Sequence, residues 1–282
     1  MGKSQYSQLR STLSPYDQLH RFLDDGYIRR QCKDGIKCYV LQGLAGLTKW
    51  PTTEFTQTLP YFEKTLSNLS HLAGYKRLGR VIKSAVDWEG YNEVLTQLAV
   101  TLWFQQKNLA KEIEPMVMRG SADILISFLS QDIYCEVASF QSILQSIISE
   151  GQDTEVRRQT KLQELMTEHP LMTVGDAEDE IDIQGFVSKL CAKVRMQLPS
   201  TYPGILVLDV SKSMILDHQI REISTRLFTK YPDLMLIMGW EWMGNEPGGQ
   251  PRGWFVNSSS QWQNIALALL KSLGQDNQVT VI

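Results

Sequence analysis

The chain has 282 residues, of which 43% are hydrophobic and 21% charged. This composition excludes wholesale disorder and allows one large domain or two smaller ones with a sizeable core. The net charge of −3 hides an asymmetry, because residues 1–119 hold 16 Lys and Arg against 11 Asp and Glu, whereas residues 120–282 hold 12 against 20. The basic first half could help to hold nucleic acid, although an excess of this size also arises by chance.

No apolar stretch is long enough to span a membrane, and the polar start MGKSQYSQLRSTLS lacks the apolar core of a signal peptide. We therefore expect a cytoplasmic protein with no membrane association. The motifs GxxxxGK(S/T), GxGxxG, GxSxG and HExxH are absent, so nothing indicates the enzyme classes that they mark. The cysteines lack close CxxC spacing, which predicts reduced packing residues and no structural zinc; they are Cys32, Cys38, Cys135 and Cys191.

The first part of the chain reads as mostly helical. Residues 16–31 have apolar side chains at helical spacing and a basic end, which predicts one helix, and residues 36–41 are β-like. These two elements could form a DNA-binding helical module with a wing or a helical cap on the core, and we favour the cap. Residues 53–84 predict one or two more helices, with breaks at Gly74 and Gly79.

A basic stripe lies in the last of these helices. Arg77, Arg80 and Lys83 fall at helical spacing, so their side chains share one face. We take them as candidates for contacts with nucleic acid, and a solvated helix face is the simpler alternative. A steep salt dependence of binding, lost when these three residues are neutralised, would separate the two interpretations.

Residues 90–107 predict an amphipathic helix. Glu93 and Gln97, four residues apart, share the face beside its buried stripe. The stripe consists of large apolar and small side chains, namely Val94, Leu95, Leu98, Ala99, Leu102 and Trp103.

Two short runs rich in β-branched and aromatic residues, 122–128 and 132–137, predict the strands of one β-hairpin. Successive side chains of a strand alternate between its faces, so the length of the loop decides which residues meet. With the two-residue loop Leu129-Ser130, Phe128 faces Gln131 and Asp123 lies opposite Glu136. A loop at Ser130-Gln131 moves the pairing by two residues and keeps both acids on one face. A loop of three residues would put the two acids on opposite faces.

Two carboxylates opposite each other on an apolar hairpin repel, and this arrangement costs stability unless a cation lies between them. A hard divalent ion suits such a site, because Mg²⁺ binds one or two carboxylates together with waters and phosphate oxygens. In the alternative interpretation, Asp123 caps the chain after a turn and Glu136 is a solvated strand residue.

The stretch GSADILI followed by IYCEVAS resembles the PD-(D/E)xK nuclease-like, or restriction-endonuclease-like, superfamily, and the resemblance covers about residues 90–211. It implies a mixed sheet flanked by helices and the hydrolysis of phosphodiester bonds with Mg²⁺ or Mn²⁺. It also implies that Asp123 and Glu136 are the metal ligands. The chain departs from the pattern at Ala138, where the superfamily has lysine, and at Ala122, where it has proline.

The resemblance suggests further members of the site. Many members of the superfamily carry a glutamate on the first helix, and the closest matches here are Gln97 and, one turn earlier, Glu93. In some members the catalytic lysine has moved to a neighbouring element. The helix predicted at residues 184–198 carries Lys193 and Gln197 beside its apolar stripe, so the resemblance makes Lys193 the candidate for the missing cation. A surface lysine is the alternative.

The rest of the chain alternates helices and strands. Residues 140–149 predict a helix, and the acidic run from Asp176 to Asp182 predicts a solvated loop or the entry of a helix. A buried, parallel strand is expected at 205–211. The remaining expected elements are a helix at 217–230, strands at 234–240 and 254–257, and a helix at 259–273.

Together these features predict an α/β or α+β chain. A mostly helical region would cover residues 1–88, and a nuclease-like core would cover residues 89–282 with a charged insertion at about 151–183. We expect a magnesium-dependent nuclease that acts on nucleic acid. The alternative is a catalytically inactive nuclease-like module that binds a protein partner, or another copy of itself, within a larger complex.

Overall fold

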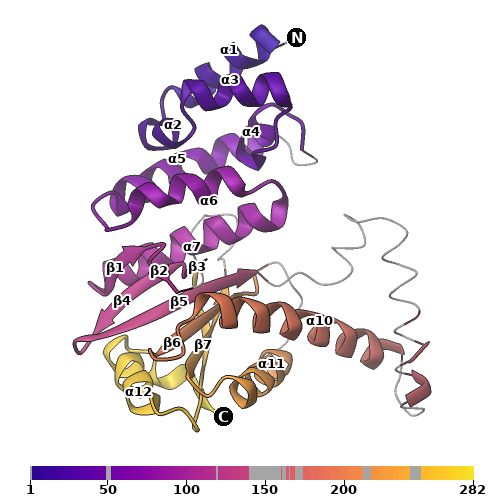
Figure 1. Ribbon diagram of the computed structural model, residues 1–282, viewed down its shortest axis with the longest axis vertical. Coiled ribbons are helices and arrows are strands. Elements are labelled where there is room, and N and C mark those ends of the chain that lie inside the picture. The colour runs from indigo at the N-terminus through magenta and orange to yellow at the C-terminus, as the bar shows by residue number, and fades with distance from the viewer. Residues whose placement is uncertain are drawn as a thin grey trace. The chain divides into compact units, whose positions relative to one another are not determined.

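The computed structural model describes residues 2–48, 52–118, 120–139, 160, 163–164, 166–168, 174–211, 217–241 and 249–282 (Figure 1). It divides into two compact units. The first comprises Met1–Val137 and Trp242–Gln250, and the second comprises Ala138–Glu241 and Pro251–Ile282. The helix predicted at residues 140–149 lies outside the described residues.

Helices form the first part of unit 1, as the sequence predicts. Their buried side chains, including Leu19, Ile28, Leu41, Leu66 and Leu98, share one apolar core. Burial of this continuous apolar surface is the main stabilising contribution to the unit. The elements are α1 (Gly2–Leu13), α2 (Asp17–Phe22), α3 (Asp25–Asp34), α4 (Tyr39–Leu44), α5 (Thr52–Leu69), the 3₁₀ turn η1 (Tyr75–Arg77), α6 (Leu78–Ser84) and α7 (Trp88–Gln106).

Two expectations for this region are wrong. Residues 16–31 form two helices, because the Asp24 side chain accepts the N–H of Tyr27 at 2.8 Å and so caps a new helix. The β-like residues 36–41 enter helix α4, which packs against α5 and α7. Its run Tyr39–Leu41 is buried, and a short apolar run of this kind is compatible with either a strand or a helix until its neighbours are known.

Of the two predicted glycine breaks, one is correct. Gly74 has φ +75 and ends the turn before η1, a backbone conformation that side chains rarely adopt. Gly79 lies inside α6 and does not break it. A Cβ atom at Gly79 would lie 2.7 Å from Cδ1 of Phe22, so this glycine allows α6 to pack closely on α2.

The strands of unit 1 form an antiparallel arrangement in which β4 pairs with both β1 and β5. A separate pair joins β2 and β3. Strand β5 crosses the unit boundary, since its last two residues, Ala138 and Ser139, belong to unit 2. The strands are β1 (Ala110–Ile113), β2 (Met116–Val117), β3 (Gly120–Ser121), β4 (Ile124–Phe128) and β5 (Gln131–Ser139).

Unit 2 follows the predicted alternation of helices and strands. Every residue of β6 is buried and the strand runs parallel to β7, as its continuous apolar sequence indicates. Helix α10 begins before the acidic run, which is therefore the entry of a helix. The elements are α10 (Val174–Gln197), β6 (Gly204–Asp209), α11 (Asp217–Lys230), β7 (Leu234–Glu241), β8 (Gln250–Val256), α12 (Gln263–Ser272), the 3₁₀ turn η2 (Asp276–Gln278) and β9 (Val279–Val281).

Hydrogen bonding orders the main strands as β1-β4-β5-β6-β7-β8-β9 in one seven-stranded sheet. The sheet is mixed, because β4 and β5 are antiparallel whereas β6 and β7 are parallel. The expected α/β class, a mixed sheet flanked by helices, is therefore confirmed. Within the described residues, no helix combines the length and apolar character that a membrane span requires.

Candidate functional site

The hairpin between β4 and β5 has a two-residue loop, one of the alternatives that the sequence left open. Phe128 pairs with Gln131, and the two residues between them, Leu129 and Ser130, have φ values of +50 and +63. Two successive positive φ values are typical of a type I′ turn, whose twist matches that of the flanking strands. The even loop therefore sets the register on which the prediction for Asp123 and Glu136 depends.

The regular pairing of β4 with β5 ends at Ile124 and does not include its neighbour Asp123. The last pair is Ile124 with Cys135, and Asp123 then donates its N–H to the Cys135 carbonyl at 3.1 Å. The Asp123 carboxylate accepts the N–H of Val137 at 2.7 Å, where a backbone carbonyl would accept it in a regular ladder. Asp123 and Glu136 therefore do not form the expected direct pair, because the Asp123 side chain binds the backbone of β5.

The backbone carbonyl of Asp123 accepts hydrogen bonds from residues outside β5. It accepts the N–H of Glu114 at 2.9 Å and the side-chain amide of Gln97 at 3.1 Å. The same Gln97 nitrogen donates to Glu114 Oε1 at 2.6 Å, and the Ser121 hydroxyl donates to Glu114 Oε2 at 2.9 Å. Hydrogen bonds thus hold both the backbone and the carboxylate of Asp123, a degree of preorganisation expected of a functional side chain.

Glu114 is the acidic member of this network that the sequence did not identify as a candidate. It is buried, with 8% of its surface exposed, and has φ +52. Buried carboxylates require hydrogen-bond donors, and Gln97 and Ser121 supply them. The available signal was an acid followed by proline, which by itself indicates only a turn.

Replacing Gln97 with glutamate, the residue that the resemblance suggests, is expected to destabilise unit 1 at neutral pH. The new carboxylate would face Glu114 where an amide now donates a hydrogen bond, and like charges at this distance favour protonation of one group. We expect a loss of about 2 kcal/mol in the free energy of unfolding at pH 7, measured with urea, and a smaller loss at pH 5. An equal loss of stability at pH 7 and pH 5 would contradict repulsion between the two carboxylates as its cause. Glu93→Gln, on the same helix, is the control.

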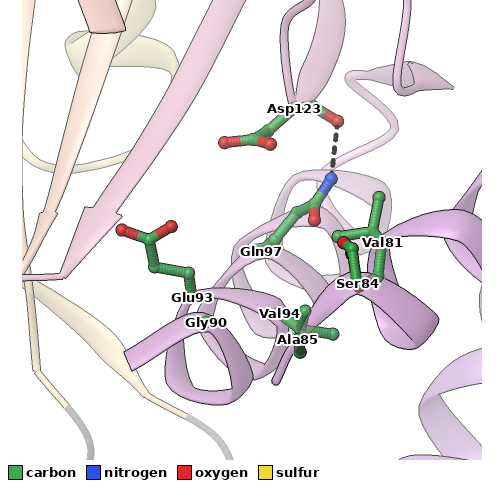
Figure 2. A pocket seen from close by; sticks show the side chains of 8 residues that line it. All are labelled: Val81, Ser84, Ala85, Gly90, Glu93, Val94, Gln97 and Asp123. Atoms are coloured by element: carbon green, nitrogen blue, oxygen red, sulfur yellow. Dashed lines mark hydrogen bonds between the residues drawn. The ribbon is translucent and has the colours of Figure 1, made fainter. Parts of the chain in front are cut away.

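The pocket beside this network brings three predicted residues together. It has a volume of about 130 Å³ and is lined by Glu93, Gln97 and Asp123, together with Val81, Ser84, Ala85, Gly90 and Val94. Figure 2 shows the carboxylates of Glu93 and Asp123 on the same side of the Gln97 amide. The expectation that Glu93 and Gln97 share a face of one helix is confirmed, and the two acids of the pocket come from that face, which carries Glu93, and from the residue before β4, Asp123.

Glu136 lies beneath the surface of β5. Its exposed fraction is 0%, and the lining of the pocket is formed by other residues. Burial raises the pKa of the Cys135 thiol well above its ordinary value, and the charges of Asp123 and Glu136 raise it further. Both acids therefore act electrostatically on one buried group of β5.

The raised pKa of Cys135 predicts a pH dependence of stability. Above the ordinary thiol pKa of 9.0, the unfolded chain loses a proton that the folded chain keeps, so the free energy of unfolding falls by about 1.4 kcal/mol per pH unit for this one group. We expect Cys135→Ala to be less stable at pH 8 but to lose stability more slowly between pH 9 and 10.5, as measured by urea unfolding. Parallel curves for the two proteins would show that Cys135 ionises normally.

Lys193 and Gln197 lie on α10, in unit 2, and both are half-buried beside its apolar stripe. They belong to a different unit from the pocket and stay candidates by resemblance. Ala138, at the position of the expected lysine, is fully buried in the apolar core of unit 2. In the part of the chain that the structure describes, no group of three His, Cys, Asp or Glu side chains has the arrangement of a metal site.

A second buried acid in unit 2 was not among the predicted site residues. Asp209 ends β6, is 2% exposed, and accepts hydrogen bonds from the backbone N–H and the hydroxyl of Ser211. The Ser139 hydroxyl, from the last residue of β5, lies 3.4 Å from its other oxygen. The signal in the sequence was an acidic residue that directly follows the apolar run ILVL.

The predicted basic stripe divides into two parts. Arg77 forms an ion pair with Glu112, at the edge strand β1. Arg80 and Lys83 instead line a larger cavity among the helices of unit 1. The stripe therefore does not act as one continuous surface.

No protein-family model, curated protein or solved structure matches this chain.

Proposed function

We propose that this chain is a metal-dependent nuclease that hydrolyses phosphodiester bonds of nucleic acid, with a restriction-endonuclease-like fold. The observation that carries the proposal is the placement of Asp123. Its backbone and carboxylate are both held by hydrogen bonds, and it lines a pocket together with Glu93 and Gln97. A mixed sheet in which an acid-bearing hairpin precedes a long helix and a buried parallel strand supports the fold.

The residue types of the two proposed ligands are those that a hard divalent cation prefers. Asp123 and Glu136 offer carboxylate oxygens, and Mg²⁺ is commonly held by one or two carboxylates, with waters and substrate phosphate oxygens completing its shell. Mn²⁺ accepts the same ligands. When bound, such an ion supplies Lewis-acid activation of the phosphodiester and offsets the charge that develops during hydrolysis.

The chain's own residues would perform the remaining tasks. The Val137 N–H orients the Asp123 carboxylate, while the Gln97 amide and the Glu114 N–H fix the Asp123 backbone. Glu93, in the same pocket, would accept a hydrogen bond from the attacking water. Lys193 would neutralise phosphate charge or orient that water, with Gln197 beside it on the same helix.

A catalytically inactive module is the second candidate, and two observations favour it. Ala138 is buried among apolar side chains at the position where the superfamily has lysine. The nitrogen of Gln97 is bonded to Glu114 and to the Asp123 carbonyl, so its amide supports the hairpin and adds no charge to the pocket. Such a module would bind a partner through the same fold without hydrolysis.

Metal-dependent cleavage separates the two candidates. We expect the wild type to cut single- or double-stranded DNA or RNA with Mn²⁺ or Mg²⁺, and Glu136→Gln to lose about 10²-fold or more of the rate. Lys193→Ala should also lose activity, whereas Lys189→Ala, one turn earlier on α10, should keep it. Loss in Glu136→Gln alone would retain the enzyme and discard Lys193. Absence of cleavage, with no Mn²⁺ binding by calorimetry, would favour the inactive module.

A further inference from the structure

A second and much larger cavity lies among the helices of unit 1. Its volume is about 1000 Å³, and its lining includes the cationic side chains of Arg21, Lys76, Arg80 and Lys83. None of the described residues that line it is Asp or Glu. A concave surface with cations and without acids concentrates positive potential, because low-dielectric walls focus the field of the charges into the cavity.

The tertiary structure assembles this cluster. Arg21 comes from α2, Lys76 from η1, and Arg80 and Lys83 from α6. The close approach of α6 to α2, which Gly79 permits by contacting the ring of Phe22, brings the distant Arg21 to the other three. The cavity therefore extends the predicted stripe by two residues and leaves out Arg77.

Among the described residues, the contacts around the cavity do not neutralise its cationic side chains. Lys83 lies with its ammonium 4.8 Å from the centre of the Tyr27 ring, a cation–π contact that keeps its charge. Arg77 carries the ion pair with Glu112 outside the cavity lining. The nearby acid Glu63 accepts the N–H groups of Gln18 and Leu19 at the start of α2.

Aromatic side chains complete the lining. Tyr27 and Tyr75 both border the cavity and are half-buried. Burial, with the charge of Glu63, raises the pKa of Tyr75 to about 12, so its hydroxyl stays neutral at physiological pH and adds no negative charge. Cations interleaved with aromatic rings are the combination by which proteins hold the backbone and bases of nucleic acids.

We infer that this cavity binds the sugar-phosphate backbone of a nucleic acid. One phosphate group does not require four cations for charge balance. The volume of the cavity also accommodates several phosphate groups linked along one strand. The inference deepens the proposed nuclease function and rests on it for its biological meaning, since the cavity would hold the strand that the enzyme cuts.

Binding can be measured apart from cleavage. Fluorescence anisotropy with a labelled single-stranded oligonucleotide, a duplex and an RNA of the same length is performed in EDTA over a range of salt concentrations. Neutralising Arg21, Lys76, Arg80 and Lys83 to glutamine is expected to weaken binding at least about tenfold and to reduce the salt slope by about 3. Four exposed cations of the same unit, Lys33, Lys37, Lys64 and Lys107, changed to glutamine serve as the charge-matched control.

The outcomes separate the inference from the proposed function. If the cavity variant loses binding and the control does not, the inference holds even where no metal-dependent cleavage is found. If both variants bind alike while the wild type cuts nucleic acid, the inference fails and the nuclease stands. Equal binding of a mononucleotide or of anionic phospholipid vesicles, displaced by the same substitutions, would overturn the assignment to a nucleic acid strand. The single charge reversal Arg80→Glu repeats the test should the fourfold variant unfold.

Discussion

Replacing Asp123 with asparagine is expected to abolish metal binding and metal-dependent cleavage while the fold is retained. Asparagine keeps an oxygen that can accept the Val137 N–H, now bonded to Asp123 Oδ2 at 2.7 Å, but it removes the charge that a divalent ion requires. We expect the rate to fall by about 10²-fold to 10³-fold. The free energy of unfolding should change by about 1 kcal/mol, because a neutral acceptor replaces a charged one.

The matched variant Asp123→Ala distinguishes a ligand from a structural residue. It removes the acceptor as well as the charge, so the N–H of the buried Val137 would lose its hydrogen bond to Asp123, at a cost of about 1–3 kcal/mol. The two variants should therefore differ in stability, measured by urea unfolding, and agree in lacking cleavage and Mn²⁺ binding by calorimetry. Retention of metal binding by Asp123→Asn would assign Asp123 a purely structural role in the hairpin.

Replacing Gly74 with alanine is expected to produce the largest loss of stability among the changes considered. Gly74 has φ +75, and an added Cβ would lie 1.8 Å from the carbonyl oxygen of Ile113. Backbone atoms cannot rotate away as a side chain does, so β1 and the loop must separate. We expect a loss of about 3 kcal/mol, from the strained φ together with the displaced backbone, measured by urea unfolding.

The control for this change is Gly274→Ala. Gly274 has a similar φ of +69, but nothing lies within 4 Å of the added Cβ, so only the cost of the positive φ applies, about 1 kcal/mol. Ile113 directly precedes Glu114, so Gly74→Ala should also disturb the hydrogen bond between Glu114 and Gln97 and lower any metal-dependent cleavage. Equal losses of stability in the two variants would show that the contact with Ile113 relaxes without cost.

The two surfaces of unit 1 suggest a division of tasks. The small pocket is acidic and preorganised around Asp123, whereas the large cavity is basic and bordered by tyrosines. A nuclease needs both kinds of surface, because it must hold an anionic strand and also present carboxylates to the metal that activates the scissile phosphate. The Asp123 variants test the first surface, and the anisotropy measurements test the second.

Local patterns in the sequence determined the position of the hairpin and the helix–strand alternation of unit 2. The runs at 122–128 and 132–137 located the hairpin but left its loop length open, which the pairing of Phe128 with Gln131 decides, whereas α11 begins and ends at the predicted residues, Asp217 and Lys230. These elements are predictable because apolar periodicity is a property of neighbouring residues. The hairpin pattern identified Asp123 and the resemblance suggested Glu93 and Gln97, and the structure brings these three residues to one pocket.

Tertiary contacts alone decided the rest. Residues 36–41 lead into helix α4, which packs against the helices α1, α5 and α7. Glu114 joins Gln97, and Arg21 joins Arg80, across long stretches of sequence. Burial, hydrogen-bond partners and summed charge depend on which segments meet in space. Periodicity specifies the face of each element but not its neighbour, so the acidic network and the basic cavity emerge only in the folded chain.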